Sequence, residues 1–208
     1  MNNTGITTRL IKLANVLTGH MYGSIGQVSV VLSTLMGGVS GSAVADAAME
    51  CRILGPEMTK RGYAPGWAAA VNCLTGLIVA TIPPSMGLIL YGTVGEVSIG
   101  RLFVAGFVPG IIMCIFMMIA TSWSARHLGY QPDHKKPSSF HEIVKCCVES
   151  IWALLFPILL IVLIRFGVMT PSESGAFAVF YALIVGAFIY KELTLESFKK
   201  CVIDSVKD

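Results

Sequence analysis

The chain has 208 residues, of which 54% are hydrophobic and only 13% are charged, against about 25% charged residues in soluble domains. Its mean hydropathy is +0.73, and a soluble fold of this size could not hide so much apolar sequence. The composition therefore excludes a soluble enzyme and predicts an all-α membrane protein in contact with the lipid bilayer. Nothing in the sequence suggests nucleic acid as a partner.

Residues 1–20 are predicted to form an amphipathic arm helix. Apolar residues recur there at helical spacing, and polar residues fill the opposite face. Such a helix either lies along the membrane surface or packs on other protein, and the sequence does not choose between the two. The apolar positions are Ile6, Leu10, Leu13 and Leu17.

Residues 21–62 are predicted to form a re-entrant helical hairpin. The run from Leu13 to Ala45 contains no Asp, Glu, Lys or Arg, and three glycines (37, 38 and 41) fall within five residues. Each glycine loosens a helix by about 1 kcal/mol relative to Ala. Basic residues flank both ends of the segment, so a full span would place them on opposite faces of the membrane. A hairpin returns both groups to the cytoplasmic face.

Residues 63–125 are predicted to form a broken transmembrane helix followed by a complete one. The uncharged run from Gly66 to Thr93 is longer than the roughly 20 residues that a span needs, and Ile82-Pro-Pro-Ser85 interrupts it. Pro84 disfavours helix at the residue before it, so the break is local. The next span, Leu102 to Ala125, is uncharged. It contains a small-x-x-x-small pair for close helix packing, Gly106 and Gly110.

The remaining sequence divides into a cytoplasmic linker (126–147), two transmembrane helices that begin a second half (148–191) and a truncated amphipathic tail (192–208). Capping-box patterns predict that helices begin after Ser139 and after Thr170. With this topology, thirteen of the fifteen Lys and Arg residues lie on the cytoplasmic face, and only Arg101 and Arg165 lie opposite. This asymmetry predicts four crossings after the hairpin.

Candidate substrate- and ion-binding residues lie at the two predicted breaks. Half-helix N-termini there would present unpaired N–H groups to an anion, and unwound carbonyl groups would coordinate Na⁺. Because Na⁺ is a hard cation, nearby hydroxyl oxygens suit it, and a Na⁺ site is possible at Ser40, Ser42 and Thr81. The alternative is that Ser and Gly only permit close helix packing. The full candidate set is Ser40, Gly41, Ser42, Asp46, Thr81, Pro83, Pro84 and Ser85.

The acidic residues near the hairpin allow several interpretations. Asp46 could cap the hairpin tip, bind a cation or lie in an aqueous crevice, because an ionisable residue at membrane depth is a functional-site hypothesis. Glu50 and Arg52 are interpreted as a surface pair near the hairpin base. We find no His-Glu-x-x-His, no phosphate-binding loop with Lys and no Gly-x-Ser-x-Gly motif. We therefore expect no enzyme activity and no organic cofactor, with an ion gradient as the energy source.

Four ordered motifs resemble a known family. They are Ser-Gly-Ser-Ala-Val-Ala-Asp (40–46), Pro-Glu-Met-Thr-Lys-Arg-Gly-Tyr (56–63), Ile-Pro-Pro-Ser (82–85) and Val-Ser-Ile-Gly-Arg-Leu-Phe-Val-Ala-Gly (97–106). These motifs are similar to those of the large membrane subunit, a DctM-like permease, of tripartite ATP-independent periplasmic (TRAP) transporters. One departure is the run from Thr75 to Ala80, where family members often carry a Ser-Ser-Thr-Ile-Gly-Pro-like sequence.

The resemblance implies a Na⁺-driven importer of small organic acids, such as C4-dicarboxylates or other carboxylates, in a bacterial or archaeal inner membrane. It implies Na⁺ as the coupling ion and two partners, a periplasmic substrate-binding protein and a smaller membrane subunit. It also implies an inverted-repeat, elevator-type fold, of which this chain covers the middle portion without the initial spans and the second hairpin. The alternative is a truncated or structural membrane protein that keeps only scaffold contacts and does not transport.

Overall fold

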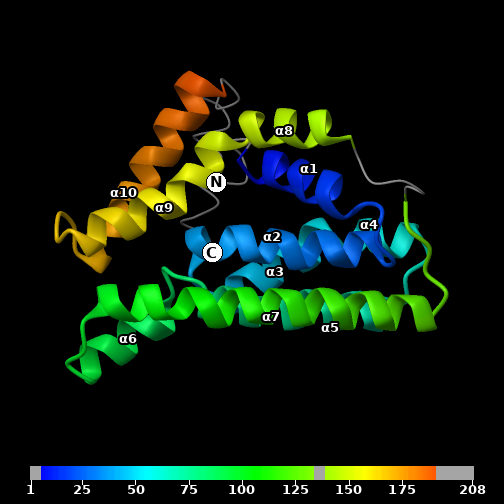
Figure 1. Ribbon diagram of the computed structural model, residues 1–208, viewed down its shortest axis with the longest axis horizontal. Helices are drawn as coiled ribbons and strands as arrows, with labels where there is room; N and C mark the ends of the chain where they lie inside the picture. Colours follow the sequence, from blue (N-terminus) through cyan, green and yellow to red (C-terminus); the bar gives the residue numbers. More distant parts are fainter. Residues whose placement is uncertain (1–5, 134–138, 191–208) are drawn as a thin grey trace.

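The computed structural model describes residues 6–133 and 139–190, and all regular secondary structure within them is helical (Figure 1). The predicted tail, 192–208, lies outside the described residues. The helices are α1 (Ile6–Thr18), α2 (Ser24–Ser40), α3 (Ala43–Ile53), α4 (Gly55–Lys60), α5 (Pro65–Thr81), α6 (Met86–Val94), α7 (Ile99–His127), α8 (Phe140–Glu149), α9 (Ile151–Arg165) and α10 (Pro171–Ile184), followed by the π-helical turn η2 (Val185–Ile189).

Helices α2 and α3 form a hairpin whose turn lies at Gly41 and Ser42. Gly41 adopts the left-handed conformation with φ 60°, which glycine reaches without steric cost. The Ser42 side chain caps α3 by accepting a hydrogen bond from Ala45 N. Hydrogen bonds then join Ser33 to Asp46 and Ser29 to Glu50, so the two helices run antiparallel.

The other two glycines of the motif do not loosen the helix, contrary to the prediction. Helix α2 continues through Gly37 and Gly38 to Ser40. A Cβ atom at Gly38 would overlap the ring of Pro157 in α9, and one at Gly37 would lie 3.2 Å from Ile82 Cβ. These two glycines therefore permit close packing, which is the alternative interpretation of the motif, and Gly41 alone produces the turn.

Helices α5 and α6 are the two halves of a helix that is bent by 41° at the Pro83–Pro84 break, as predicted. The long helix α7 packs directly on this break. A Cβ atom at Gly106 would lie 2.7 Å from Thr81 O, and one at Gly110 would lie 2.5 Å from Ile82 Cγ1. The predicted role of these two glycines in close packing is confirmed.

The arm helix α1 packs on protein. Its apolar face is buried against α2, α8 and α9, whereas Leu17 at its end is 37% exposed. Lys12 of α1 forms a 2.8 Å ion pair with Glu149 of α8. The structure therefore favours the second of the two interpretations of this helix. The buried apolar residues of its face are Ile6, Leu10, Leu13 and Ala14.

Both predicted capping boxes are present. The backbone N–H of Thr170 donates to Glu173 Oε2 over 2.7 Å, and Glu173 N–H donates back to Thr170 Oγ1 over 3.3 Å. A capping box of the same kind begins α8 at Ser139, where the Glu142 side chain accepts from the Ser139 N–H. Two helix boundaries were thus correctly predicted from local side-chain chemistry.

Contacts bring segments that are rich in basic residues together at one end of the molecule. Arg61, at the hairpin base, forms an ion pair with Asp133 after α7, and the Tyr130 hydroxyl accepts a hydrogen bond from Ala64 N–H over 2.9 Å. At the opposite end, the start of α7 meets the end of α9, where Gly100 lies against Arg165. The base of the hairpin therefore lies beside the segment that follows α7, at the end of the molecule opposite the start of α7.

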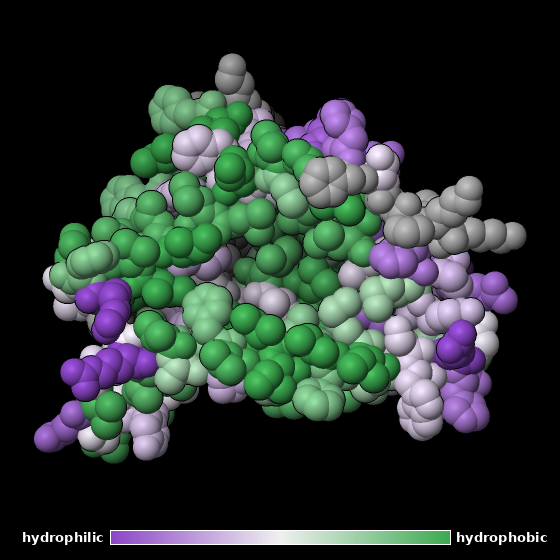
Figure 2. Space-filling model, in the orientation of Figure 1, coloured by the Kyte–Doolittle hydropathy of each residue, from purple (hydrophilic) through white to green (hydrophobic). Residues whose placement is uncertain are grey.

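The surface has the character of a multi-pass membrane protein. Among the described residues, helix α7 is long and apolar enough to cross a membrane, and up to three spans result if the bent pairs α5–α6 and α8–α9 each count as one. Figure 2 shows hydrophobic residues covering α7 and α9, with hydrophilic residues gathered toward the edges. The lipid-compatible surface of α7 includes Val108, Ile111, Ile112, Ile115, Phe116 and Ile119.

Candidate functional site

The hairpin tip lies directly on the Pro-Pro break. The Met86 N–H at the start of α6 donates to Gly41 O over 3.1 Å. A Cβ atom at Gly41 would lie 2.8 Å from Pro84 O, so a larger residue would push the tip away from the break. Next to it, a Cβ atom at Gly76 would lie 2.9 Å from Ala43 O. The two irregular segments therefore form one site.

Four helix ends converge at this site. Helices α2 and α5 end at Ser40 and Thr81, and helices α3 and α6 begin at Ala43 and Met86. The first N–H groups and last carbonyl groups of a helix lack partners within it, and the helix dipole adds partial positive charge at N-termini and partial negative charge at C-termini. The site therefore offers donors to an anion and carbonyl oxygens to a cation.

The predicted hydroxyl groups at the site are mostly engaged in local hydrogen bonds. Thr81 Oγ1 donates to Leu77 O over 2.9 Å, and Ser85 Oγ reaches across the break to Ala80 O over 2.6 Å. Ser42 is half-buried at its capping position, and Ser40 is exposed. No hydrogen bond joins Ser40, Ser42 and Thr81 to one another among the described residues. Pro83, Pro84 and Ser85 are buried.

A second polar group of side chains lies away from the tip, between α2, α3 and α5, and we call it the acid-pair cluster. It centres on two carboxyl groups, Asp46 and Glu50, which are one turn apart on α3 and only 1% and 0% exposed. Four further buried side chains surround them. These are Ser29 and Ser33 of α2 and Asn72 and Thr75 of α5.

Hydrogen bonds connect the whole acid-pair cluster. Ser33 Oγ lies 2.8 Å from Asp46 Oδ2 and 2.7 Å from Glu50 Oε1. Glu50 Oε2 contacts both Ser29 Oγ and Thr75 Oγ1, the latter at 2.9 Å. Asn72 Oδ1 lies 2.9 Å from Ser29 Oγ. The cluster thus ties both arms of the hairpin to the first half of the broken helix.

The interpretation of Glu50 and Arg52 as a surface pair is wrong. Glu50 is fully buried in the cluster, whereas Arg52 is exposed. Residues two apart in a helix do not face each other, which explains the separation. Asp46 does not cap the tip either, because Ser42 caps α3 and Asp46 is bonded to Ser33.

Sequence reasoning missed four members of the cluster, although a signal was present. Each helix contributes two polar residues three or four positions apart, and such residues share a helix face. The pairs are Ser29 with Ser33, Asp46 with Glu50 and Asn72 with Thr75. Because α2 and α5 contain no charged residues, the polar pairs on these two helices predict that their polar faces meet in the interior rather than face water.

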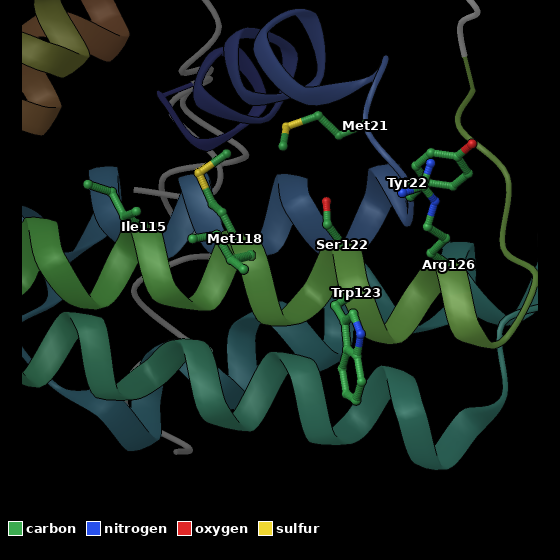
Figure 3. A pocket seen from close by; sticks show the side chains of 8 residues that line it. Met21, Tyr22, Ile115, Met118, Ser122, Trp123 and Arg126 are labelled. Atoms are coloured by element: carbon green, nitrogen blue, oxygen red, sulfur yellow. The ribbon is translucent and has the colours of Figure 1, made fainter.

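A separate groove of about 440 Å³ lies between α7 and the segment joining α1 to α2 (Figure 3). Its lining is mainly apolar, and its one guanidinium group, Arg126, lies 4.7 Å from the centre of the Tyr22 ring. The groove offers no convergent set of polar groups for a small carboxylate. Its lining residues are Met21, Tyr22, Ile115, Met118, Ile119, Ser122, Trp123 and Arg126.

Comparison with known proteins gives one consistent result. The family model described as the tripartite ATP-independent periplasmic transporter, DctM component, matches residues 1–208. A putative TRAP transporter large permease protein of Haemophilus influenzae is 38% identical over 207 residues, covering 100% of this chain and 48% of that protein.

Two further relatives are named for their substrates. The 2,3-diketo-L-gulonate TRAP transporter large permease protein YiaN of Escherichia coli is 37% identical over 100% of this chain and 48% of its own length. The sialic acid TRAP transporter large permease protein SiaM of Vibrio cholerae is 36% identical over 99% of this chain and 48% of its own length. The chain thus spans about half the length of these relatives.

The relatives are transporter subunits rather than enzymes, and the family implies a tripartite system with a small membrane subunit and a periplasmic binding protein. The apolar helices of the chain are compatible with a membrane permease. The chain therefore belongs to the DctM component family, the large permease subunits of TRAP transporters.

Proposed function

We propose that this chain supplies the first hairpin and the broken helix of a Na⁺-driven TRAP permease that imports a small organic acid. The hydrogen bond from Met86 N–H to Gly41 O carries this proposal, because it joins the hairpin tip to the break. The relatives named for diketogulonate and sialic acid support a carboxylate substrate. The coupling ion would be Na⁺, and the substrate would arrive from the periplasmic binding protein.

The roles of the helix ends follow from their polarity. Carbonyl groups at the ends of α2 and α5, together with the lone pairs of the Ser42 and Thr81 hydroxyls, would bind Na⁺. The N-termini of α3 and α6 would face the carboxylate of the substrate. Bound Na⁺ would offset the negative charge of the substrate, so that the two bind together.

We also propose that the hairpin is re-entrant and moves with the broken helix as one body in an elevator motion. The acid-pair cluster supports this proposal, because buried hydrogen bonds join α2, α3 and α5. Helix α7 and the arm helix α1 would belong to the surrounding scaffold. The smaller membrane subunit would brace that scaffold in the inner membrane.

The proposal is tested by uptake into proteoliposomes that contain the intact large subunit with its small subunit and its binding protein. Import of a radiolabelled organic acid bound by that binding protein is measured with an inward Na⁺ gradient and with choline in its place. We expect uptake only with Na⁺. Ser42→Ala should raise the Na⁺ concentration for half-maximal uptake about tenfold, equivalent to about 1.4 kcal/mol.

The matched control is Thr93→Ala on α6, because the Thr93 hydroxyl donates only to Ile89 O of its own helix. This variant should retain the Na⁺ dependence of the unmodified protein. Uptake that ignores the Na⁺ gradient would refute the coupling. A complex that binds its partners but imports nothing would instead support the non-transporting alternative.

A further inference from the structure

The acid-pair cluster contains more oxygen contacts than its hydroxyl protons can satisfy. Ser33 Oγ lies within hydrogen-bond distance of both Asp46 Oδ2 and Glu50 Oε1, yet a serine hydroxyl has one proton to donate. If both carboxyl groups were ionised, one of these two contacts would join oxygen lone pairs without a proton between them. One carboxyl group must therefore donate to Ser33.

The environment gives a second reason for a bound proton. Asp46 Oδ1 and Asn72 Nδ2 are buried without a hydrogen-bond partner, and Asn72 is 0% exposed. A buried ionised carboxylate is costly unless it is paired. No Lys, Arg or His of the described residues forms an ion pair with Asp46 or Glu50. Two negative charges here would repel each other, with no cation beside them to offset either one.

One proton resolves most of these conflicts. A proton on Asp46 Oδ2 donates to Ser33, and the Ser33 hydroxyl then donates to Glu50 Oε1. Rotating the Asn72 amide by half a turn directs its unpartnered Nδ2 to Ser29, whose own hydroxyl then donates to Glu50 Oε2. The Thr75 hydroxyl donates to the same Glu50 oxygen. Glu50 thereby accepts three hydroxyl hydrogen bonds as an ionised group.

We propose that Asp46 and Glu50 form a proton-binding site that holds one proton in common while α3 lies against α2 and α5. Ser33 Oγ bridges the two carboxyl groups at hydrogen-bond distances, 2.8 Å to Asp46 Oδ2 and 2.7 Å to Glu50 Oε1, and contacts of this length suit shared protons rather than a metal ion. The proton belongs to the pair, because two strongly interacting carboxyl groups titrate as a unit. The site is distinct from the proposed Na⁺ site at the tip.

Few other titratable groups face the pair. Helices α2 and α5 contain no Asp, Glu, Lys, Arg or His, and their one titratable side chain is the thiol of Cys73. Helix α3 itself adds the Cys51 thiol and the exposed Arg52, and α4 adds the exposed Glu57 and Lys60. A carboxylic acid signal from the interior of the hairpin can therefore come only from Asp46 or Glu50.

Infrared spectroscopy of the full chain in lipid nanodiscs tests the proposal, since a protonated carboxyl group absorbs apart from carboxylates and amides. Near neutral pH, we expect a carboxylic acid band that shifts when the chain is made with isotopically labelled aspartate and glutamate. Asp46→Asn and Glu50→Gln should each abolish the band, because an amide N–H then donates to Ser33 and no proton is needed. Glu96→Gln, at an exposed loop, should leave it unchanged.

Three results would overturn the proposal. Absence of the band in the unmodified chain would show that both carboxyl groups are ionised. Persistence of the band in both single variants would show that Asp46 and Glu50 each bind a proton of their own, rather than one proton in common. Exchange of NaCl for choline chloride at constant pH should not alter the band, and its loss in NaCl would assign the cluster to Na⁺ instead. None of these readouts depends on transport, so failure of the proposed function would leave this inference testable.

Discussion

Replacing Gly41 with Ala tests whether the hairpin tip is seated on the Pro-Pro break. Gly41 has φ 60°, and a Cβ atom there would lie 2.8 Å from the backbone oxygen of Pro84. The left-handed conformation costs a non-glycine residue about 1–2 kcal/mol. Displacement of the tip would also remove the hydrogen bond from Met86 N–H to Gly41 O, worth about 0.5–1.5 kcal/mol net. We therefore expect Gly41→Ala to destabilise the chain by about 2–3 kcal/mol.

Gly62→Ala provides the matched control. Gly62 also has a positive φ, 84°, but no atom lies within 4 Å of the position that a Cβ would occupy. This variant should therefore show only the conformational cost of about 1–2 kcal/mol. The difference between the two variants isolates the contact between the tip and the break.

The assay is reversible unfolding of the purified chain in mixed micelles, with helicity and tryptophan fluorescence followed as denaturing detergent is added. Coincident transitions from the two probes would justify a two-state free energy. Gly41→Ala should lose more stability than Gly62→Ala, by the roughly 0.5–1.5 kcal/mol of the lost hydrogen bond. Equal losses would refute the inference that the tip packs on the break, and with it the single site formed by the two segments.

Two further outcomes follow from the packing and from the acid pair. Gly38→Ala should destabilise the chain in the same assay, because its Cβ would overlap Pro157, whereas Gly175→Ala, with no atom nearby, should be neutral or stabilising. The melting temperature should fall as pH is raised, because the folded chain holds a proton that the unfolded chain releases more readily. Glu50→Gln should reduce this pH dependence, and an unchanged slope would contradict the shared proton.

The sequence predicted those parts of the fold that depend on local backbone chemistry. Gly41 marks a turn because glycine reaches the left-handed conformation without steric cost, and the Pro83–Pro84 pair marks a break because proline cannot continue a helix. The capping residue Thr170 marks a helix start, since its side chain bonds to nearby backbone. Such signals involve residues close in sequence and need no knowledge of tertiary structure.

The parts that could not be predicted depend on contacts between distant segments. The adjacent glycines Gly37 and Gly38 suggested a break in the helix. In the structure the helix continues through them, because Gly38 packs against Pro157 of α9 and Gly37 packs against Ile82 beside the Pro83–Pro84 break. Glu50 lies two residues from Arg52, which suggested a surface pair. Its true partners are Ser29, 21 residues earlier, and Thr75, 25 residues later.

The central claim is that the segment containing Gly41 enters the membrane and returns to the same side. Single cysteines at the exposed positions Thr8, Lys60 and Glu96, in a cysteine-free background, can be labelled with a membrane-impermeant reagent in vesicles of known orientation. The account predicts that positions 8 and 60 react from the cytoplasmic side and position 96 from the opposite side. Reaction of positions 8 and 60 from opposite sides would contradict it.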